Sequence, residues 1–344
     1  MDIKGLVRKN IRELIPYSSA RDEYSGGDAV LLDANESPYN EPYNRYPDPV
    51  QLALKEKISG MISIPVERIF LGNGSDEAID LAIRIFCEPG SDRIIIIDPS
   101  YGMYKVCADI NNVAVDFVSL NEDFSLDADR LLAAVRKNTK LIFLCSPNNP
   151  SANLLDQGEI TRIMSAFGGM VVLDEAYIDF CGGEGMLPEL GNHRNLILLR
   201  TLSKAWGLAG IRLGMALADP EVVGYMNRVK YPYNVNYLTQ TKALEMLESG
   251  RSRDEWIKEI LSGRKMLESR LKEFGYVLKI FPSDANFLLV RVKDPEGLYA
   301  FLNERGVIVR NRSHLTHCHG CLRITVGTAE ENNRLIELMI SYSQ

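Results

Sequence analysis

The stretch TLSKAWGLAGIRLG, residues 201–214, places a lysine at the point where a buried strand is expected to end. The apolar run NLILLR (195–200) directly precedes it and is typical of a strand that is covered on both faces. Small residues surround Lys204, and Arg212 follows within the same stretch. An ordinary surface lysine needs no such setting, so we expect its amine to have a chemical role.

Further apolar runs lie upstream, and they are apolar throughout rather than alternating: RIIIID (93–98), KLIFLC (140–145) and MVVLD (170–174). Such runs favour a parallel sheet between two layers of helices. Apolar positions between residues 79 and 86 recur with the spacing of an amphipathic helix. The sequence therefore predicts an α/β fold.

The last third of the chain has a different pattern. Residues 239–274 read as mostly helical, and shorter strand-like runs follow at 285–292, 306–310 and 321–327, before a last helix at 329–342. Residues 1–45 are polar and irregular. We therefore expect an N-terminal segment (1–40) that packs with the C-terminal unit, a large domain (41–238), and a small α+β domain (239–344).

Composition limits the function classes. The chain has 344 residues, 46% of them hydrophobic, and a net charge of 39 − 46 = −7, which argues against non-specific binding of nucleic acid or anionic membranes. It shows no membrane-spanning run and no signal-peptide core. The six cysteines are scattered, as in a reduced compartment, so we predict a cytoplasmic protein.

Polar side chains follow directly on the expected strands. In an open α/β sheet, ligands bind outside the carboxyl ends of the strands. We therefore expect one edge of the sheet to collect Tyr101, Asn149, Asp174, Tyr177, Ser203 and Lys204.

The segment GNGSD (72–76) adds an anion site. Gly74, Ser75 and Asp76 precede a helix whose free N–H groups favour a phosphate, although a plain capped helix fits the same residues. A dinucleotide fingerprint fits less well, because Glu77 stands where its third glycine belongs.

Pyridoxal phosphate requires these groups together. Its aldehyde binds a lysine amine, here Lys204, and its ring nitrogen needs a carboxylate, here Asp174. Burial near Arg212 would lower the pKa of the lysine and suit it to act as a general base. The remaining contacts would come from Asn149 and Tyr177 to the ring oxygen, Tyr101 stacked on the ring, and Gly74, Ser75, Asp76, Thr201, Ser203 and Arg212 around the phosphate.

The motifs SPNNP (146–150), VVLDEAYIDF (171–180) and TLSKAWGLAGIRLG resemble the fold-type-I pyridoxal-phosphate aminotransferases. Within them the chain is similar to the histidinol-phosphate aminotransferases, through PYSSARDEY (16–24), LDANESPYN (32–40), RYPDP (45–49), YPYNVN (231–236) and LRITVGT (322–328). The resemblance implies a large domain with a mostly parallel seven-stranded sheet, and a homodimer with shared active sites. It also implies transamination between L-histidinol phosphate and 2-oxoglutarate, in histidine biosynthesis.

The same resemblance implies further site residues. Arg323 would bind the α-carboxylate of glutamate and the phosphate of histidinol phosphate in turn, with Arg310 as a second phosphate ligand. Tyr46 would reach the cofactor phosphate of the neighbouring subunit, and Tyr17 would close the pocket over the imidazole. Asn35 is either a loop residue or part of the pocket.

One departure from the family pattern concerns Ser151 and Ala152, where the family usually has Thr-Gly. If the backbone at Ala152 has a positive φ, the alanine costs on the order of 1 kcal/mol. This cost would not abolish the fold.

Three alternative functions stay open. Threonine-phosphate decarboxylation and aromatic transamination use the same scaffold, and a non-catalytic pyridoxal-phosphate-binding protein is more remote because no DNA-binding arm is present. The segment HLTHCHGC (314–321) carries zinc-ligand types, but no matching pair lies elsewhere, so we predict no metal site.

Overall fold

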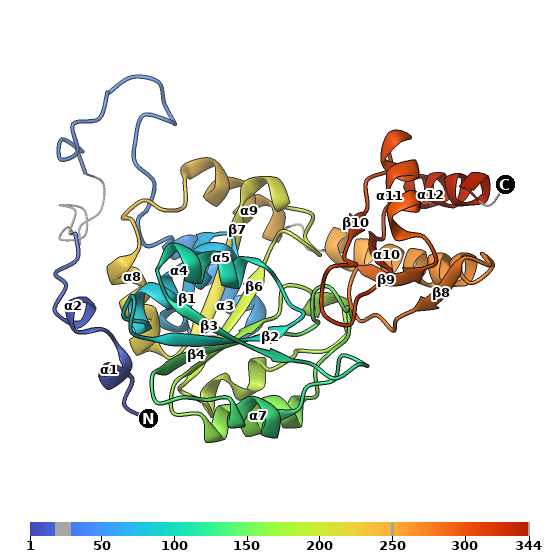
Figure 1. The fold of residues 1–344 in the computed structure, drawn as a ribbon. Coiled ribbons are helices and arrows are strands. Elements are labelled where there is room, and N and C mark those ends of the chain that lie inside the picture. Colours follow the sequence, from blue (N-terminus) through green and yellow to red (C-terminus); the bar gives the residue numbers. More distant parts are fainter. Residues whose placement is uncertain (18–28, 249–250, 343–344) are drawn as a thin grey trace.

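A computed structural model describes residues 1–17, 29–248 and 251–342 of the chain. Its centre is a large sheet with helices on both faces (Figure 1). In the described residues this sheet has seven strands: β1 (Ile69–Asn73), β2 (Arg93–Asp98), β3 (Ala114–Ser119), β4 (Thr139–Cys145), β5 (Met170–Asp174), β6 (Leu196–Thr201) and β7 (Leu213–Ala218). Their order is β1-β7-β6-β5-β4-β2-β3, and only β7 runs antiparallel to its neighbours. The prediction of a mostly parallel sheet is confirmed.

Alternate residues of each strand enter two separate cores. Ile95 and Ile97 pack on one face, whereas Ile94 and Ile96 pack on the other, so the strand is apolar throughout. The first face is covered by α3 (Leu52–Ile62), α6 (Ala128–Ala133), α7 (Gln157–Ala166) and α9 (Tyr237–Glu248). The second is covered by α1 (Ile3–Leu6), α2 (Lys9–Arg12), α4 (Ser75–Phe86), α5 (Met103–Ile110) and α8 (Pro220–Val229). Short 3-10 helices lie between these elements: η2 (Val66–Arg68), η3 (Ile178–Phe180), η4 (Leu187–Gly191) and η5 (Ala209–Ile211).

A smaller antiparallel sheet forms from the last part of the chain. Its order is β10-β11-β9-β8, with β8 (Val277–Ile280), β9 (Phe287–Val292), β10 (Arg310–Asn311) and β11 (Cys321–Thr325). The helices α10 (Arg251–Leu271), α11 (Pro295–Glu304) and α12 (Ala329–Tyr342) pack on it around a core of their own. Most of the expected strand at 306–310 is not a strand, since β10 begins only at its last residue.

The N-terminal helices lie on the large sheet. Ile3 of α1, Val7 between the two helices and Ile11 of α2 are buried in the layer of α4 and α8. Figure 1 shows α1 and α2 on the opposite side of the large sheet from α10–α12. This differs from the expectation that residues 1–40 pack with the C-terminal unit, although residues 18–28 of that segment lie outside the described part.

The two sheets meet beside the carboxyl ends of β4 and β5. Ala152, Tyr177 and Phe287 belong to one apolar cluster, against which residues of α10 pack. The backbone N–H of Asp284 donates to the carbonyl of Ala152 (2.7 Å), and its carboxylate accepts from the N–H of Leu154 (2.8 Å). These contacts fix the small sheet over the edge where the polar residues gather.

Candidate active site

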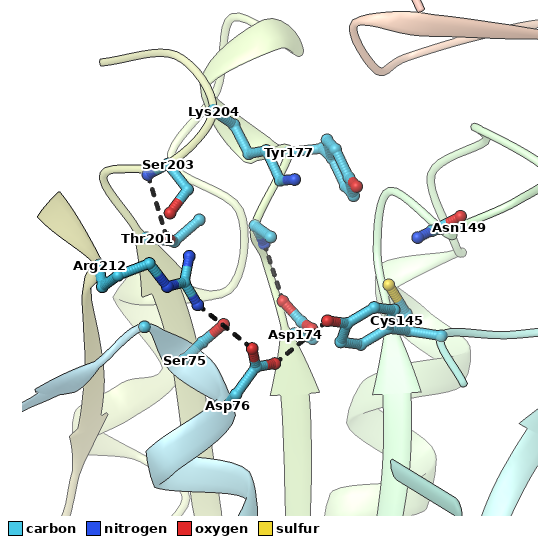
Figure 2. A pocket seen from close by; sticks show the side chains of 13 residues that line it. Ser75, Asp76, Cys145, Asn149, Asp174, Tyr177, Thr201, Ser203, Lys204 and Arg212 are labelled. Atoms are coloured by element: carbon cyan, nitrogen blue, oxygen red, sulfur yellow. Dashed lines mark hydrogen bonds and ion pairs between the residues drawn. The ribbon is translucent and has the colours of Figure 1, made fainter. Parts of the chain in front are cut away.

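A pocket of about 490 Å³ lies at the carboxyl ends of β4, β5 and β6. Figure 2 shows Arg212, Ser75 and Asp76 on one side of it, with Asp174 between them and Asn149. It is lined by Gly74, Ser75, Asp76, Tyr101, Cys145, Asn149, Asp174, Ala176, Tyr177, Thr201, Ser203, Lys204 and Arg212. The structure thus brings together the residues that the sequence predicted around one small molecule, and adds Cys145 and Ala176.

Lys204 extends into this pocket from the loop after β6. Its Nζ lies 5.4 Å from the centroid of the Tyr177 ring. Burial lowers the pKa of the Lys204 amine, and the positive charges of Arg323 and Arg212 lower it further, against the opposing effect of Asp174. A larger fraction of this amine is therefore neutral at a given pH, as attack on an aldehyde requires.

Asp174 ends β5 and is only 3% exposed. Its carboxylate accepts hydrogen bonds from the Tyr104 hydroxyl (2.8 Å) and from the N–H of Ala176 (3.0 Å). Burial raises the pKa of Asp174, whereas these two hydrogen bonds oppose that rise. A buried carboxylate held in this way fits a positively charged ring nitrogen.

Tyr104 is the main residue of this site that the sequence reasoning missed. Its ring is fully buried, stacks on Phe143 with 5.0 Å between centroids, and meets Tyr101 edge-on. The sequence signal was the second tyrosine of PSYGMY (99–104), one helical turn after the first. Only the structure shows that its hydroxyl points at Asp174.

The anion site forms where β1 turns into α4. Gly74 has φ +72°, and a Cβ at this position would lie 2.7 Å from Nη2 of Arg212, so only glycine fits. Among the described residues, no side chain caps α4. Uncapped N–H groups next to a guanidinium are a suitable site for a phosphate.

Arg212 and Tyr101 are tied together through Asp76. The Asp76 carboxylate accepts from the Tyr101 hydroxyl (3.1 Å) and from Arg212 Nη2 (3.4 Å). Thr201 Oγ1 accepts from the N–H of Ser203 (3.1 Å), which holds the loop that carries Lys204. Several of the predicted cofactor ligands on this side are therefore held by a neighbour.

Arg323 approaches the pocket from β11 of the small sheet. Its Nη1 donates to Asn149 Oδ1 (2.5 Å), and burial lowers its pKa. Arg310 faces it directly across β10 and β11 and is exposed. Neither arginine is in the lining of the pocket, but Arg323 contacts a residue that is. Two arginines opposed on neighbouring strands are suited to bind a carboxylate or a phosphate.

Three further predicted site residues, Tyr46, Asn35 and Tyr17, do not line this pocket. Tyr46 stacks on Tyr233, with 4.4 Å between ring centroids, and shares a second cavity with Asn35. Tyr17 is 70% exposed. The role predicted for Tyr46 requires a second subunit, and the roles of all three residues stay predictions.

The segment 314–321 connects the two sheets. The Thr316 hydroxyl donates to the carboxylate of Asp98, and His317 Nε2 lies 3.1 Å from the carbonyl oxygen of Leu120. Across the described residues, no group of three or more His, Cys, Asp or Glu side chains is placed to hold a metal ion.

The six cysteines of the chain are free thiols in the structure. None of the helices in the described ranges is long and apolar enough to cross a bilayer.

Comparison with known proteins identifies the family. The model of the family "Aminotransferase class I and II" matches residues 23–339. The chain belongs to this family. It is 55% identical over 338 residues to the histidinol-phosphate aminotransferase of Parabacteroides distasonis, covering 98% of both chains. It is also 53% identical to that of Bacteroides fragilis, covering 99% of both chains. The family depends on pyridoxal phosphate, as the residues of the pocket predicted.

Solved aminotransferase structures share the fold. The histidinol-phosphate aminotransferase from Clostridium acetobutylicum superposes with a TM-score of 0.80 at 23% identity, covering 88% of this chain and 91% of that one. The enzyme from Sinorhizobium meliloti, solved in complex with pyridoxal-5'-phosphate, gives a TM-score of 0.78 at 23% identity, with 90% of each chain covered. L-threonine-O-3-phosphate decarboxylase from Porphyromonas gingivalis also matches, with a TM-score of 0.73 at 24% identity, covering 87% of this chain and 91% of that one. The aminotransferase fold is therefore common to several reactions.

Proposed function

We propose that this aminotransferase moves an amino group between L-histidinol phosphate and 2-oxoglutarate, giving imidazole acetol phosphate and L-glutamate in histidine biosynthesis. The observation that carries this proposal is the position of Arg323, which donates to Asn149 in the lining of the pocket that also contains Lys204. Relatives with about half of their residues identical over nearly the whole chain carry this activity in their names, which supports the choice of substrate.

The residues of the pocket fit pyridoxal phosphate. Asp174 would hold the ring nitrogen, Lys204 would bind the aldehyde, and Gly74, Ser75 and Arg212 would hold the phosphate. When bound, the cofactor withdraws electrons from the substrate carbon that loses a proton, and it keeps the amino group between the two half-reactions.

The protein's own part is to position groups and move one proton. The lowered pKa of the Lys204 amine suits it to take the proton from the substrate carbon and to deliver it to the adjacent carbon of the cofactor. Arg323 would hold the anionic group of either substrate, so the same site serves both half-reactions in a ping-pong sequence. Tyr101, hydrogen-bonded to Asp76, would cover the ring and limit the access of water.

We also propose a cytoplasmic homodimer with shared active sites. Large exposed apolar side chains in the N-terminal segment support it, since Val30 and Leu32 are 87% and 89% exposed and Tyr39 is 79% exposed. Tyr46 of one subunit would then reach the cofactor phosphate of the other. Light scattering should give twice the chain mass, and a monomer at micromolar concentration would contradict the proposal.

The direct test follows the visible absorbance of the purified holoenzyme during titration with histidinol phosphate. The aldehyde form should convert to the amine form and return on addition of 2-oxoglutarate. Lys204→Ala should keep the fold by circular dichroism and lose turnover. Carbon dioxide release from threonine phosphate, or a preference for phenylpyruvate, would instead support the decarboxylase or the aromatic enzyme. Bound cofactor that reacts with no amine would support a binding protein.

A further inference from the structure

Three arginines lie along one face of the small sheet. The register of β10 and β11 places Arg310 directly opposite Arg323, and opposed residues of antiparallel strands share a face. Arg312 lies two positions beyond Arg310, and its N–H continues the ladder by donating to the carbonyl of Cys321 (2.8 Å). Because side chains alternate along a strand, Arg312 lies on the same face as the other two.

This cluster lacks a counter-charge within the described residues. No carboxylate there forms an ion pair with any of the three guanidiniums, and Nε of Arg312 is buried without a hydrogen-bond partner. Burial, with the charges of Arg323 and Arg310, lowers the pKa of Arg312 to about 10. Three like charges held together, one of them partly removed from water, repel one another. Binding of an anion between them would relieve this repulsion.

Arg312 is also close to the active site. Its backbone pairs with Cys321, two residues before Arg323, and Nη1 of Arg323 donates to Asn149 in the lining of the pocket. The charges of both arginines also oppose the effect of burial, which raises the pKa of the Tyr177 hydroxyl. The anion that these arginines favour is therefore part of the substrate rather than a distant surface ligand.

We propose that Arg312 is a specificity-determining residue that joins Arg310 and Arg323 in binding the phosphate of the amino donor. This inference rests on the proposed function. A carboxylate has two oxygens and one charge, which two facing guanidiniums satisfy. A phosphate ester has three peripheral oxygens and a charge of about −1.5 to −2 at pH 7, which gives a third guanidinium its own partner. Arg312 therefore distinguishes histidinol phosphate from glutamate.

The test compares three amino donors in single-turnover reactions of the holoenzyme: histidinol phosphate, histidinol without the phosphate, and glutamate. Arg312→Gln should lower kcat/KM for histidinol phosphate by roughly tenfold to a hundredfold, the range of a lost charge-assisted hydrogen bond. The other two donors should change less than about threefold. Arg312→Lys should recover part of the loss, because lysine keeps the charge without the planar fork.

A matched control is Arg305→Gln, since Arg305 lies on the same unit at the end of α11 and its guanidinium covers the exposed face of Phe301. It should leave all three reactions unchanged. As a second readout, inorganic phosphate should raise the melting temperature of the wild-type holoenzyme more than that of Arg312→Gln.

Equal losses for histidinol phosphate and glutamate, or an unchanged reaction with histidinol phosphate, would overturn the role of Arg312. A wild-type enzyme that reacts with glutamate but not with histidinol phosphate would instead overturn the proposed function. In that case the phosphate-dependent shift in melting temperature still decides whether Arg312 binds the anion.

Discussion

Replacing Tyr104 by phenylalanine removes one donor from Asp174 and leaves the packing intact. The ring is fully buried and stacks on Phe143, so phenylalanine fills the same space. The lost group is the hydroxyl that donates to Asp174 over 2.8 Å. A hydrogen bond to a charged group contributes about 1.5–3 kcal/mol, so its loss should raise the pKa of Asp174 further.

The direction of the shift in the pH dependence of cofactor binding follows from which protonation form of Asp174 binds the cofactor. The carboxylate form pairs with a protonated ring nitrogen, so cofactor affinity falls as the pH falls through the pKa of Asp174. Burial already raises this pKa, and the Tyr104 hydroxyl opposes the rise. Tyr104→Phe should therefore move the acid limb of cofactor binding to higher pH, and at a pH on that limb the cofactor affinity should fall by roughly tenfold to a hundredfold.

The assay titrates the cofactor-free protein with pyridoxal phosphate at a series of pH values, to locate the acid limb of cofactor binding in each variant. The matched control is Tyr342→Phe, which removes a tyrosine hydroxyl from an exposed aspartate, Asp294, at 2.9 Å. The control should bind the cofactor with the wild-type pH dependence. An acid limb at the same pH in Tyr104→Phe and wild type would refute the reasoning.

Three further predictions concern stability, measured as the free energy of unfolding in urea. Ala152→Gly should change it by less than about 0.5 kcal/mol. Relief of the left-handed backbone (φ +71°) gains about 1–2 kcal/mol, and loss of a buried methyl and the greater freedom of unfolded glycine together cost nearly as much; a change above about 1.5 kcal/mol would contradict this. Arg200→Met should destabilise by about 3–5 kcal/mol at neutral pH, because it leaves the carboxylate of Glu175, 2% exposed, without its 2.8 Å ion pair. Burial raises the pKa of Glu175, so this loss should shrink as the pH falls toward 4, and a loss independent of pH would exclude the charge as its cause. Lys55→Met should stabilise by up to about 3 kcal/mol at pH 7, since burial lowers the pKa of Lys55 from 10.5 to about 8. That gain should vanish above pH 10.5, where lysine is neutral in both states, and a gain that persists there would have another origin.

The central strands could be predicted because burial on both faces leaves a strong local signal. The runs at 93–98 and 170–174 coincide with β2 and β5, and the run at 140–145 differs from β4 by one residue. The edge strand β3 gave no such signal, because several of its residues are exposed or partly exposed. The strand β7 lies partly inside the motif quoted first, and its antiparallel direction depends on pairing with β1 and β6 rather than on its own residues.

The position of the N-terminal helices could not be predicted for a related reason. Ile3, Val7 and Ile11 are apolar residues of a short, interrupted helical segment, and such residues do not indicate which surface covers them. The groove between α4 and α8 that accepts them is formed by segments far away in the chain.

The lining of the pocket was largely predictable because parallel strands bring their carboxyl ends to one edge. Each motif in the lining directly follows a strand, so predicting that strand was enough to place the motif at this edge. Tyr104 and Arg312 were missed because their contacts cross between elements. Tyr104 of α5 donates to Asp174 at the end of β5. Arg312 directly follows β10, a strand of two residues, and the pairing of β10 with β11 determines the face on which Arg312 lies.

One physical cause links the unusual pKa values of the site. Removal from water raises the pKa of the acid Asp174 and lowers the pKa values of the bases Lys204, Arg312 and Arg323, so both kinds of group are driven toward their neutral forms. The cationic ring nitrogen of the cofactor would compensate the effect at Asp174, and the anionic group of the substrate would compensate the effect at Arg312 and Arg323. Cofactor and substrate binding should therefore stabilise the fold as well as enable the reaction, because the charges that the empty fold holds at a cost become paired when they bind.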